Sequence, residues 1–219
     1  MNNTLPKLKE AIRIVTAAAT EYEESLNNKN FVFIFKNRIT NQIEYFETVF
    51  LSRNFQHLTG LYFIDHNGKN VQNSTYFYRK CLHSSLNDRE IKFKSDGTTE
   101  LKLQALPLIV KFLKTSKMTA IYNSSKPKLT IERLVGTTAF CLGFKKDHHY
   151  YVPASCLLED IRNLSDITFQ ILAVFSKPSN KAFPIYTDIC YVAKGVNLIN
   201  LSLPNELSSL ISLEKYNSK

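Results

Sequence analysis

The chain has 219 residues, of which 44% are hydrophobic and 21% charged, a composition typical of a globular protein with one well-formed core. No run approaches the roughly 20 apolar residues of a membrane span, and the polar N-terminal stretch lacks the continuous apolar segment of a signal peptide. The four cysteines are widely spaced without a C-x-x-C pair, which favours reduced thiols over a disulfide framework or a zinc site. We therefore expect a cytoplasmic domain with no membrane contact, no metal site and no cofactor.

The formal net charge of +9 is concentrated in the middle of the chain. Between Arg79 and Lys146 there are 14 basic and five acidic residues, so this span carries the whole excess and the remainder is neutral. A basic middle between neutral ends favours a polyanionic partner such as a nucleic acid. Solubility alone is the competing explanation.

The first predicted element is an amphipathic helix, because apolar residues recur at steps of three and four from Leu5 to Leu26. The stripe suits packing on its own domain, which we expect first, or contact with a second copy in a homodimer. Two strand-like runs at 31–35 and 43–50 then predict a β-hairpin.

The hairpin leads to residues 55–60, Phe-Gln-His-Leu-Thr-Gly, around which we organise the functional prediction. Thr59 and Gly60 are turn formers and predict a tight turn. In an extended turn, His57 and Thr59 would point into one pocket. An imidazole beside a hydroxyl is suited to moving protons on a phosphate ester, whereas a packed structural histidine is the alternative interpretation.

The remaining pattern predicts helices first and strands afterwards. Helices are expected at 74–82 and 98–117, and Pro107 would kink or split the second one. A short helix is expected at 153–162, and a weak one after Pro204. Strands are expected at 118–122, 129–134, 138–144, 149–152, 168–175 and 185–193.

This order indicates an α+β fold in which helices pack on an antiparallel β-sheet. We divide the chain into an N-terminal helical appendage at residues 1–29, an α+β domain at 30–200, and a C-terminal helix and tail at 201–219.

Several blocks of the sequence, taken together in their order and spacing, also carry a family resemblance. They lie at residues 55–60, 76–82, 98–103, 125–129, 143–144, 151–153 and 158–162. The chain from about Phe31 to about Ile171 resembles the phage-encoded Barnase–EndoU–colicin–RelE-like nuclease domains, particularly their fourth group. One departure is Ala154-Ser155-Cys156, which stands where Asn-Thr-Val or a similar triplet is expected after the proline.

The resemblance implies a compact α+β nuclease of mobile-element origin that cleaves RNA without a metal, as a toxin or defence effector. Such cleavage needs a base for the ribose 2′-OH, an acid for the leaving 5′-oxygen, and cations around the phosphorane. We expect His57 to be the base or acid, and Thr59 to hold a phosphate oxygen or orient His57. The expected catalytic residues are His57, Thr59, Lys102 and Tyr78, and the expected substrate-binding residues are Lys80, Arg79, Lys128 and Ser155.

Each assignment has a structural alternative. Lys102 can be a solvated helix lysine and Tyr78 a core aromatic, since both residue types more often have those roles. His148 and His149 can supply a second proton carrier or form an exposed strand end.

The expected partner is RNA, with DNA as the second choice. An antitoxin or a phage protein, and a second copy through the helix from Leu5 to Leu26, are further expected partners. A catalytically inactive nucleic-acid-binding module and a protein-interaction adaptor are the alternative functions.

Overall fold

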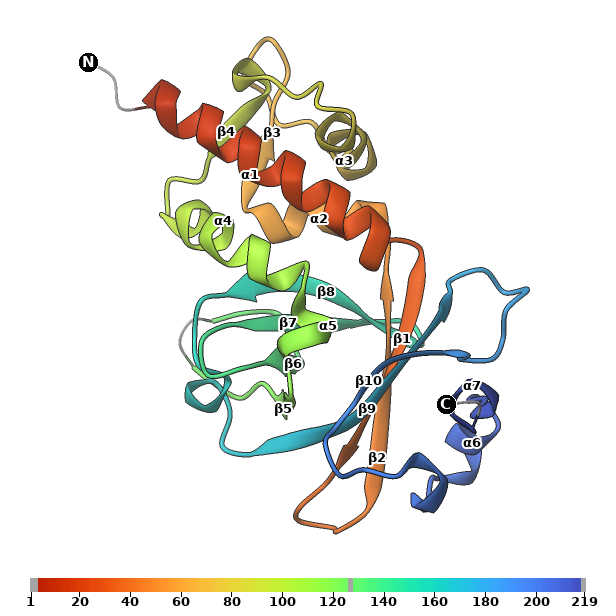
Figure 1. The fold of residues 1–219 in the computed structure, drawn as a ribbon. Coiled ribbons are helices and arrows are strands. Elements are labelled where there is room, and N and C mark those ends of the chain that lie inside the picture. Colours follow the sequence, from red (N-terminus) through yellow and green to blue (C-terminus); the bar gives the residue numbers. More distant parts are fainter. Residues whose placement is uncertain (1–3, 126–127, 218–219) are drawn as a thin grey trace.

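The computed structural model describes residues 4–125 and 128–217 and shows a group of helices above a strongly curved β-sheet (Figure 1). This arrangement confirms the predicted α+β class. Lys126 and Pro127, within one block of the family resemblance, lie outside the described residues. The helices are α1 (Thr4–Ser25), α2 (Ser52–Thr59), α3 (Ser74–Leu82), α4 (Thr98–Ile109), α5 (Phe112–Thr115), α6 (Asn205–Ser208) and α7 (Glu214–Asn217).

The strands form one eight-stranded sheet and a separate two-stranded ribbon of β3 and β4. The order in the large sheet is β1-β2-β8-β7-β6-β5-β9-β10, and β1 also pairs with β9, so seven strands close into a ring. Only the short β2–β8 contact is parallel among the described strand pairs. The strands are β1 (Lys29–Lys36), β2 (Ile43–Phe50), β3 (Leu61–Phe63), β4 (Ile91–Phe93), β5 (Met118–Ile121), β6 (Arg133–Gly136), β7 (Cys141–Asp147), β8 (Tyr150–Leu157), β9 (Thr168–Pro178) and β10 (Asp188–Val192).

Strand β1 is apolar on both faces because both faces are buried. Phe33 lies in the main core, where its ring stacks on Phe46 with centroids 5.0 Å apart. Val32 and Ile34 point to the opposite face, which the C-terminal segment with Leu198 covers. The continuous apolar run that predicted this strand is thus explained by two cores on either side of it.

The N-terminal helix is present as predicted, and its apolar stripe packs within its own chain. Val15, Ala19, Tyr22 and Leu26 are fully buried in the main core. The Tyr22 hydroxyl also donates a hydrogen bond to the carbonyl oxygen of Leu51 (3.0 Å), at the start of α2. The boundaries at residues 29/30 and 200/201 stay predictions, although α1 and the sheet share one core.

Two predicted elements are wrong. The expected turn at 55–60 is the second half of helix α2, because Gly60, with φ of +70°, caps a helix. The expected helix at 153–162 is largely the end of strand β8. Pro153 is accommodated in that strand where the register with β7 shifts beside Phe144, as prolines in sheets often are at bulges.

Two further boundaries also differ from the predictions. The helix expected at 98–117 is split into α4 and α5 past Pro107. Strand β6 begins at Arg133 rather than at residue 129. In the described part of the chain, no helix has the length and apolar character needed to cross a membrane.

Candidate active site

His57 is partly exposed in the last turn of α2, on the side of the helix that faces away from the core. Phe55 and Leu58 are fully buried and fix the rotation of the helix. Arg53 lies four residues before His57, so both side chains share one helix face. The helix thereby presents an imidazole and a guanidinium to the same stretch of surface.

The C-terminal end of α2 is held by three side chains that bind its open carbonyl groups. The Thr59 hydroxyl donates to the carbonyl of Gln56 (2.8 Å), Lys102 Nζ donates to that of His57 (2.9 Å), and the Cys156 thiol donates to that of Leu58 (3.0 Å). The backbone that carries His57 is therefore anchored by α4 and β8.

Gly60 lets helix α4 approach this end of α2 closely. A Cβ atom at Gly60 would lie 2.9 Å from Lys102 Cδ and 3.1 Å from Thr99 Cα. The Thr99 hydroxyl donates to the Gly60 carbonyl (2.7 Å) and closes the contact. Both the positive φ and the close approach thus favour glycine at this position.

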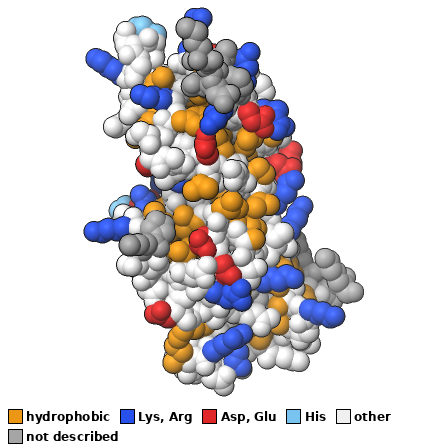
Figure 2. All heavy atoms as spheres, turned by 90° about the vertical axis from the view of Figure 1, so that its left-hand side faces the viewer, with side chains coloured by type: hydrophobic (Ala, Val, Ile, Leu, Met, Phe, Trp, Pro, Cys, Tyr) orange, Lys and Arg blue, Asp and Glu red, His pale blue; other side chains and the backbone are white. Residues whose placement is uncertain are grey.

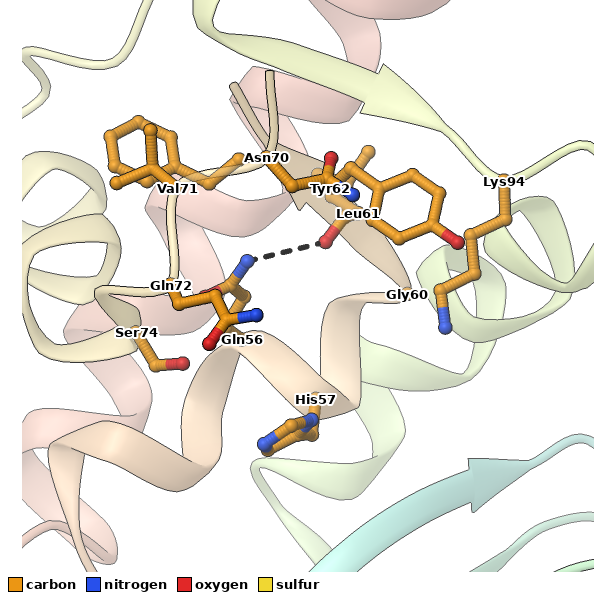
Figure 3. A pocket seen from close by; sticks show the side chains of 11 residues that line it. Gln56, His57, Gly60, Leu61, Tyr62, Asn70, Val71, Gln72, Ser74 and Lys94 are labelled. Carbon is orange, nitrogen blue, oxygen red and sulfur yellow. Dashed lines mark hydrogen bonds between the residues drawn. The ribbon is translucent and has the colours of Figure 1, made fainter. Parts of the chain in front are cut away.

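Two hollows meet at His57 and share both His57 and Ser74. We call the first, about 490 Å³, the amide pocket, because three side-chain amides line it (Figure 3). It is lined by Gln56, His57, Gly60, Leu61, Tyr62, Phe63, Asn70, Val71, Gln72, Ser74 and Lys94.

We call the second hollow, about 280 Å³, the basic pocket. It is lined by Arg53, Asn54, His57, Ser74, Lys145, Asp147, Val152, Pro153 and Ala154. Because the two pockets share His57 and Ser74, they are adjacent, and we refer to the pair as the groove, with the imidazole at the junction.

The groove lowers the pKa of His57. Partial burial of the imidazole is the largest cause, and the positive charges of Lys145, Lys102 and Lys94 add to it. A lowered pKa leaves the imidazole neutral near pH 7, with a nitrogen free to accept a proton. The pKa of Lys102 is lowered too, mainly by burial.

Residues 14–193 match the family model described as phage-Barnase-EndoU-ColicinE5/D-RelE like nuclease 4. The chain belongs to this family. The resemblance noted in the sequence is thereby confirmed, and the match includes every residue of both pockets. No match is found among curated proteins or among solved structures.

Within this phage-type nuclease domain, three predicted catalytic residues meet at the end of α2. Lys102 reaches the backbone of His57, whereas Thr59 is fully buried. The Thr59 hydroxyl also accepts a hydrogen bond from the Leu61 N–H (3.1 Å), so its contacts lie inside the helix end. Its position suits holding the backbone of His57 rather than touching a phosphate.

The structure does not bring Tyr78 to the groove. Tyr78 is buried beside α1, where its hydroxyl donates to Glu23 Oε2 (2.6 Å), and burial raises its pKa strongly. A phenol in this position serves the packing of α3 on α1.

The predicted substrate-binding residues also lie outside the two described pockets. Lys80 forms an ion pair with Glu90, and Arg79 and Lys128 are exposed elsewhere on the surface. Ser155 is buried and lines a separate apolar hollow with Leu101 and Leu158. Figure 2 shows hydrophobic side chains gathered across the middle of one face of the molecule.

Three cations of the groove were missed as individual site residues: Arg53, Lys94 and Lys145. Lys94 and Lys145 belong to the basic middle of the chain, but nothing in the sequence singled them out. Arg53 would have been found had 52–59 been predicted as a helix, since it lies one turn before His57.

Metal ligands do not cluster in the described residues: no group of three or more His, Cys, Asp or Glu side chains is arranged to hold an ion. Asp147 is the one carboxylate among the described residues that line the two pockets. It lies 3.5 Å from the Arg53 guanidinium in an exposed ion pair, which contributes little to stability.

Proposed function

We propose that the groove cleaves RNA phosphodiester bonds without a metal ion, with His57 as the general base. The observation that carries the proposal is the single imidazole, with its lowered pKa, at the junction of two pockets and surrounded by lysines. Family membership supplies the nuclease class. That the cleavage needs no metal and that the substrate is RNA are further parts of the proposal. They rest on the imidazole and the lysines of the groove, which can serve as a base and as phosphate-binding groups.

In the proposed reaction, neutral His57 takes the proton of a ribose 2′-OH. The 2′-oxygen then forms a bond to phosphorus, and the bond from phosphorus to the 5′-oxygen breaks. The leaving 5′-oxygen takes a proton from a neighbouring ammonium group or from water. The products are a 2′,3′-cyclic phosphate end and a free 5′-hydroxyl end.

The lysines supply the electrostatic part of this mechanism. Negative charge builds up on the phosphoryl oxygens in the transition state, and fixed cations beside it lower the barrier. Lys94 lines the amide pocket and Lys145 the basic pocket, so a phosphate at the junction would lie between two cations. Lys102 holds the end of α2 and adds a third positive charge.

The test uses a labelled single-stranded RNA in the presence of EDTA. We expect cleavage to persist, to leave 2′,3′-cyclic phosphate ends, and to stop at a position where the ribose is replaced by 2′-deoxyribose. Cleavage that requires added Mg²⁺, or that acts equally on DNA of the same sequence, would overturn the mechanism.

A biological role as a toxin or defence effector follows as a second part of the proposal, supported by the phage-type nuclease family alone. Expression of the chain in growing cells should then stop growth, and expression of the His57→Ala variant should not. Equal growth arrest by both proteins would contradict a role that depends on cleavage. An antitoxin or a phage protein is the expected partner, and a homodimer through α1 would have to use the face of that helix that is not buried.

A further inference from the structure

We propose that the amide pocket binds one nucleobase of a single-stranded RNA, adjacent to the phosphate at His57. The inference rests on the proposed function and specifies its substrate. It assigns the two halves of the groove to different parts of a nucleotide, one to the phosphate and the other to the base.

The two pockets differ in the kind of side chains that line them, in the way this division requires. The basic pocket holds two cations, Arg53 and Lys145, and because Asp147 pairs with Arg53, Lys145 is the cation left for the sugar–phosphate backbone. The amide pocket has one cation, Lys94, and no carboxylate among its described lining residues, and its other walls are amide, aromatic and apolar side chains. Its volume of about 490 Å³ lies in the range of small-molecule sites, which combine apolar walls with a few polar groups.

Tyr62 provides an aromatic face for stacking. It lies on β3 between the buried residues Leu61 and Phe63, and it remains 39% exposed. Lys94 Nζ lies 5.7 Å from the centre of its ring, so a cation sits beside the stacking surface. Stacking of unpaired bases on aromatic rings is the common way in which proteins hold single-stranded RNA.

The amide groups can bind the edge of the stacked base. A side-chain amide both donates and accepts hydrogen bonds, as the edges of all four bases require. In the described part of the chain, the side-chain amides of Asn70 and Gln72 have no hydrogen-bond partner, and that of Gln56 makes one long contact to the Leu61 carbonyl (3.5 Å). In Figure 3, Gln56 and Gln72 lie on the same side of the pocket as His57.

The segment that carries two of these amides is fixed by its backbone. The Val71 N–H donates to the carbonyl of Phe63 (2.7 Å), and Asp65 closes the preceding turn by accepting from the Lys69 N–H (2.9 Å). Asn73 then caps α3 by accepting from the Tyr76 N–H (2.9 Å). Asn70 and Gln72 therefore lie on a loop that is anchored at both ends.

A base inside a duplex cannot present both its ring face and its pairing edge to such a pocket. The base must be unpaired, as in a loop or a single strand. The enzyme should therefore prefer single-stranded RNA to a duplex.

The test measures binding rather than cleavage, so that its result does not depend on catalysis. The His57→Ala variant is titrated at low salt with a short fluorescent single-stranded RNA and with the same RNA carrying one abasic site. We expect the abasic RNA to bind more weakly by roughly 5- to 150-fold, the worth of one base stacked on an aromatic ring. Adding Tyr62→Ala should remove this difference, whereas Tyr62→Phe should keep it.

Phe183→Ala is the matched control, because Phe183 is an exposed aromatic residue (53%) that lines neither of the two described pockets. Equal affinity for the intact and abasic RNA, equal affinity for a duplex, or no binding of any RNA overturns the base site. Equal cleavage of single-stranded and duplex RNA by the unaltered protein would keep the proposed function while rejecting this inference.

Discussion

His57 combines the two properties that a general base needs at neutral pH, accessibility and a lowered pKa. The charged imidazole is disfavoured by partial burial and by three lysines from different parts of the chain. In the proposed mechanism the same lysines would also stabilise a bound phosphate, so one set of charges would both tune the base and bind the substrate. The Thr59 hydroxyl donates to the Gln56 carbonyl and accepts from the Leu61 N–H. It therefore holds the backbone next to His57.

The pH dependence of cleavage should report this environment. If neutral His57 is the base, the rate rises with pH and flattens below the usual histidine pKa of about 6.5. Lys145→Met removes one of the charges that disfavour the imidazolium ion, so the inflection should move to higher pH. Lys181→Met, an exposed lysine outside the described groove, should leave it in place. An inflection that stays fixed or moves down in Lys145→Met would contradict the role of these lysines.

Helix α2 shows how a local signal can be correct in part and still mislead. Gly60 and Thr59 do mark the end of an element, but the element is a helix and not the extended segment that was expected. Phe55 and Leu58, three residues apart and fully buried, are the helical signal that the turn formers obscured. In strand β8 the error is reversed, because a strand was predicted as a helix. Pro153 suggested the start of a helix, but it lies in the sheet where the register with β7 shifts.

Gly60 provides a stability test of the packing between α2 and α4. Gly60→Ala should lower the free energy of unfolding by about 1–2 kcal/mol for the positive φ, and further for the contacts with Lys102 and Thr99. Gly68→Ala is a matched control, because Gly68 also has a positive φ (+74°) but nothing lies within 4 Å of its added Cβ.

Urea unfolding of the two variants separates the contact from the backbone cost. The difference between Gly60→Ala and Gly68→Ala measures the close approach of α4. Equal losses of stability would show that this approach is loose in solution.

At the scale of the whole molecule, the groove draws on α2, the ribbon of β3 and β4, and the β7–β8 hairpin. The sequence predicted the amphipathic α1, the β1–β2 hairpin and the basic middle, because those features are local. It could not predict that Arg53, Lys94 and Lys145 lie around one imidazole, since their proximity depends on the tertiary fold. The sequence predicted Lys80 to bind the substrate and Tyr78 to be catalytic. In the fold, Lys80 instead pairs with Glu90, and the Tyr78 hydroxyl donates to Glu23.

The salt dependence of RNA binding tests whether the net charge acts through this groove. Affinity should fall steeply with salt, and each lysine that contacts a phosphate should contribute about 0.7 to the logarithmic slope for a single strand. Lys94→Ala and Lys145→Ala should therefore reduce the slope, while Lys80→Ala, which removes a residue paired with Glu90, should change it little. An affinity that is the same at low and high salt would contradict the groove as a polyanion site.

The most direct test of the account is cleavage of a labelled RNA by His57→Ala in EDTA, with folding verified by circular dichroism. We predict a loss of about 10²–10⁴ in rate, as is usual when a general base is removed, and a smaller loss for Thr59→Ala. His83→Ala removes an exposed histidine that lines neither described pocket and should cleave normally. Full activity in folded His57→Ala would contradict the assignment, and His148 and His149 would then be the residues to replace.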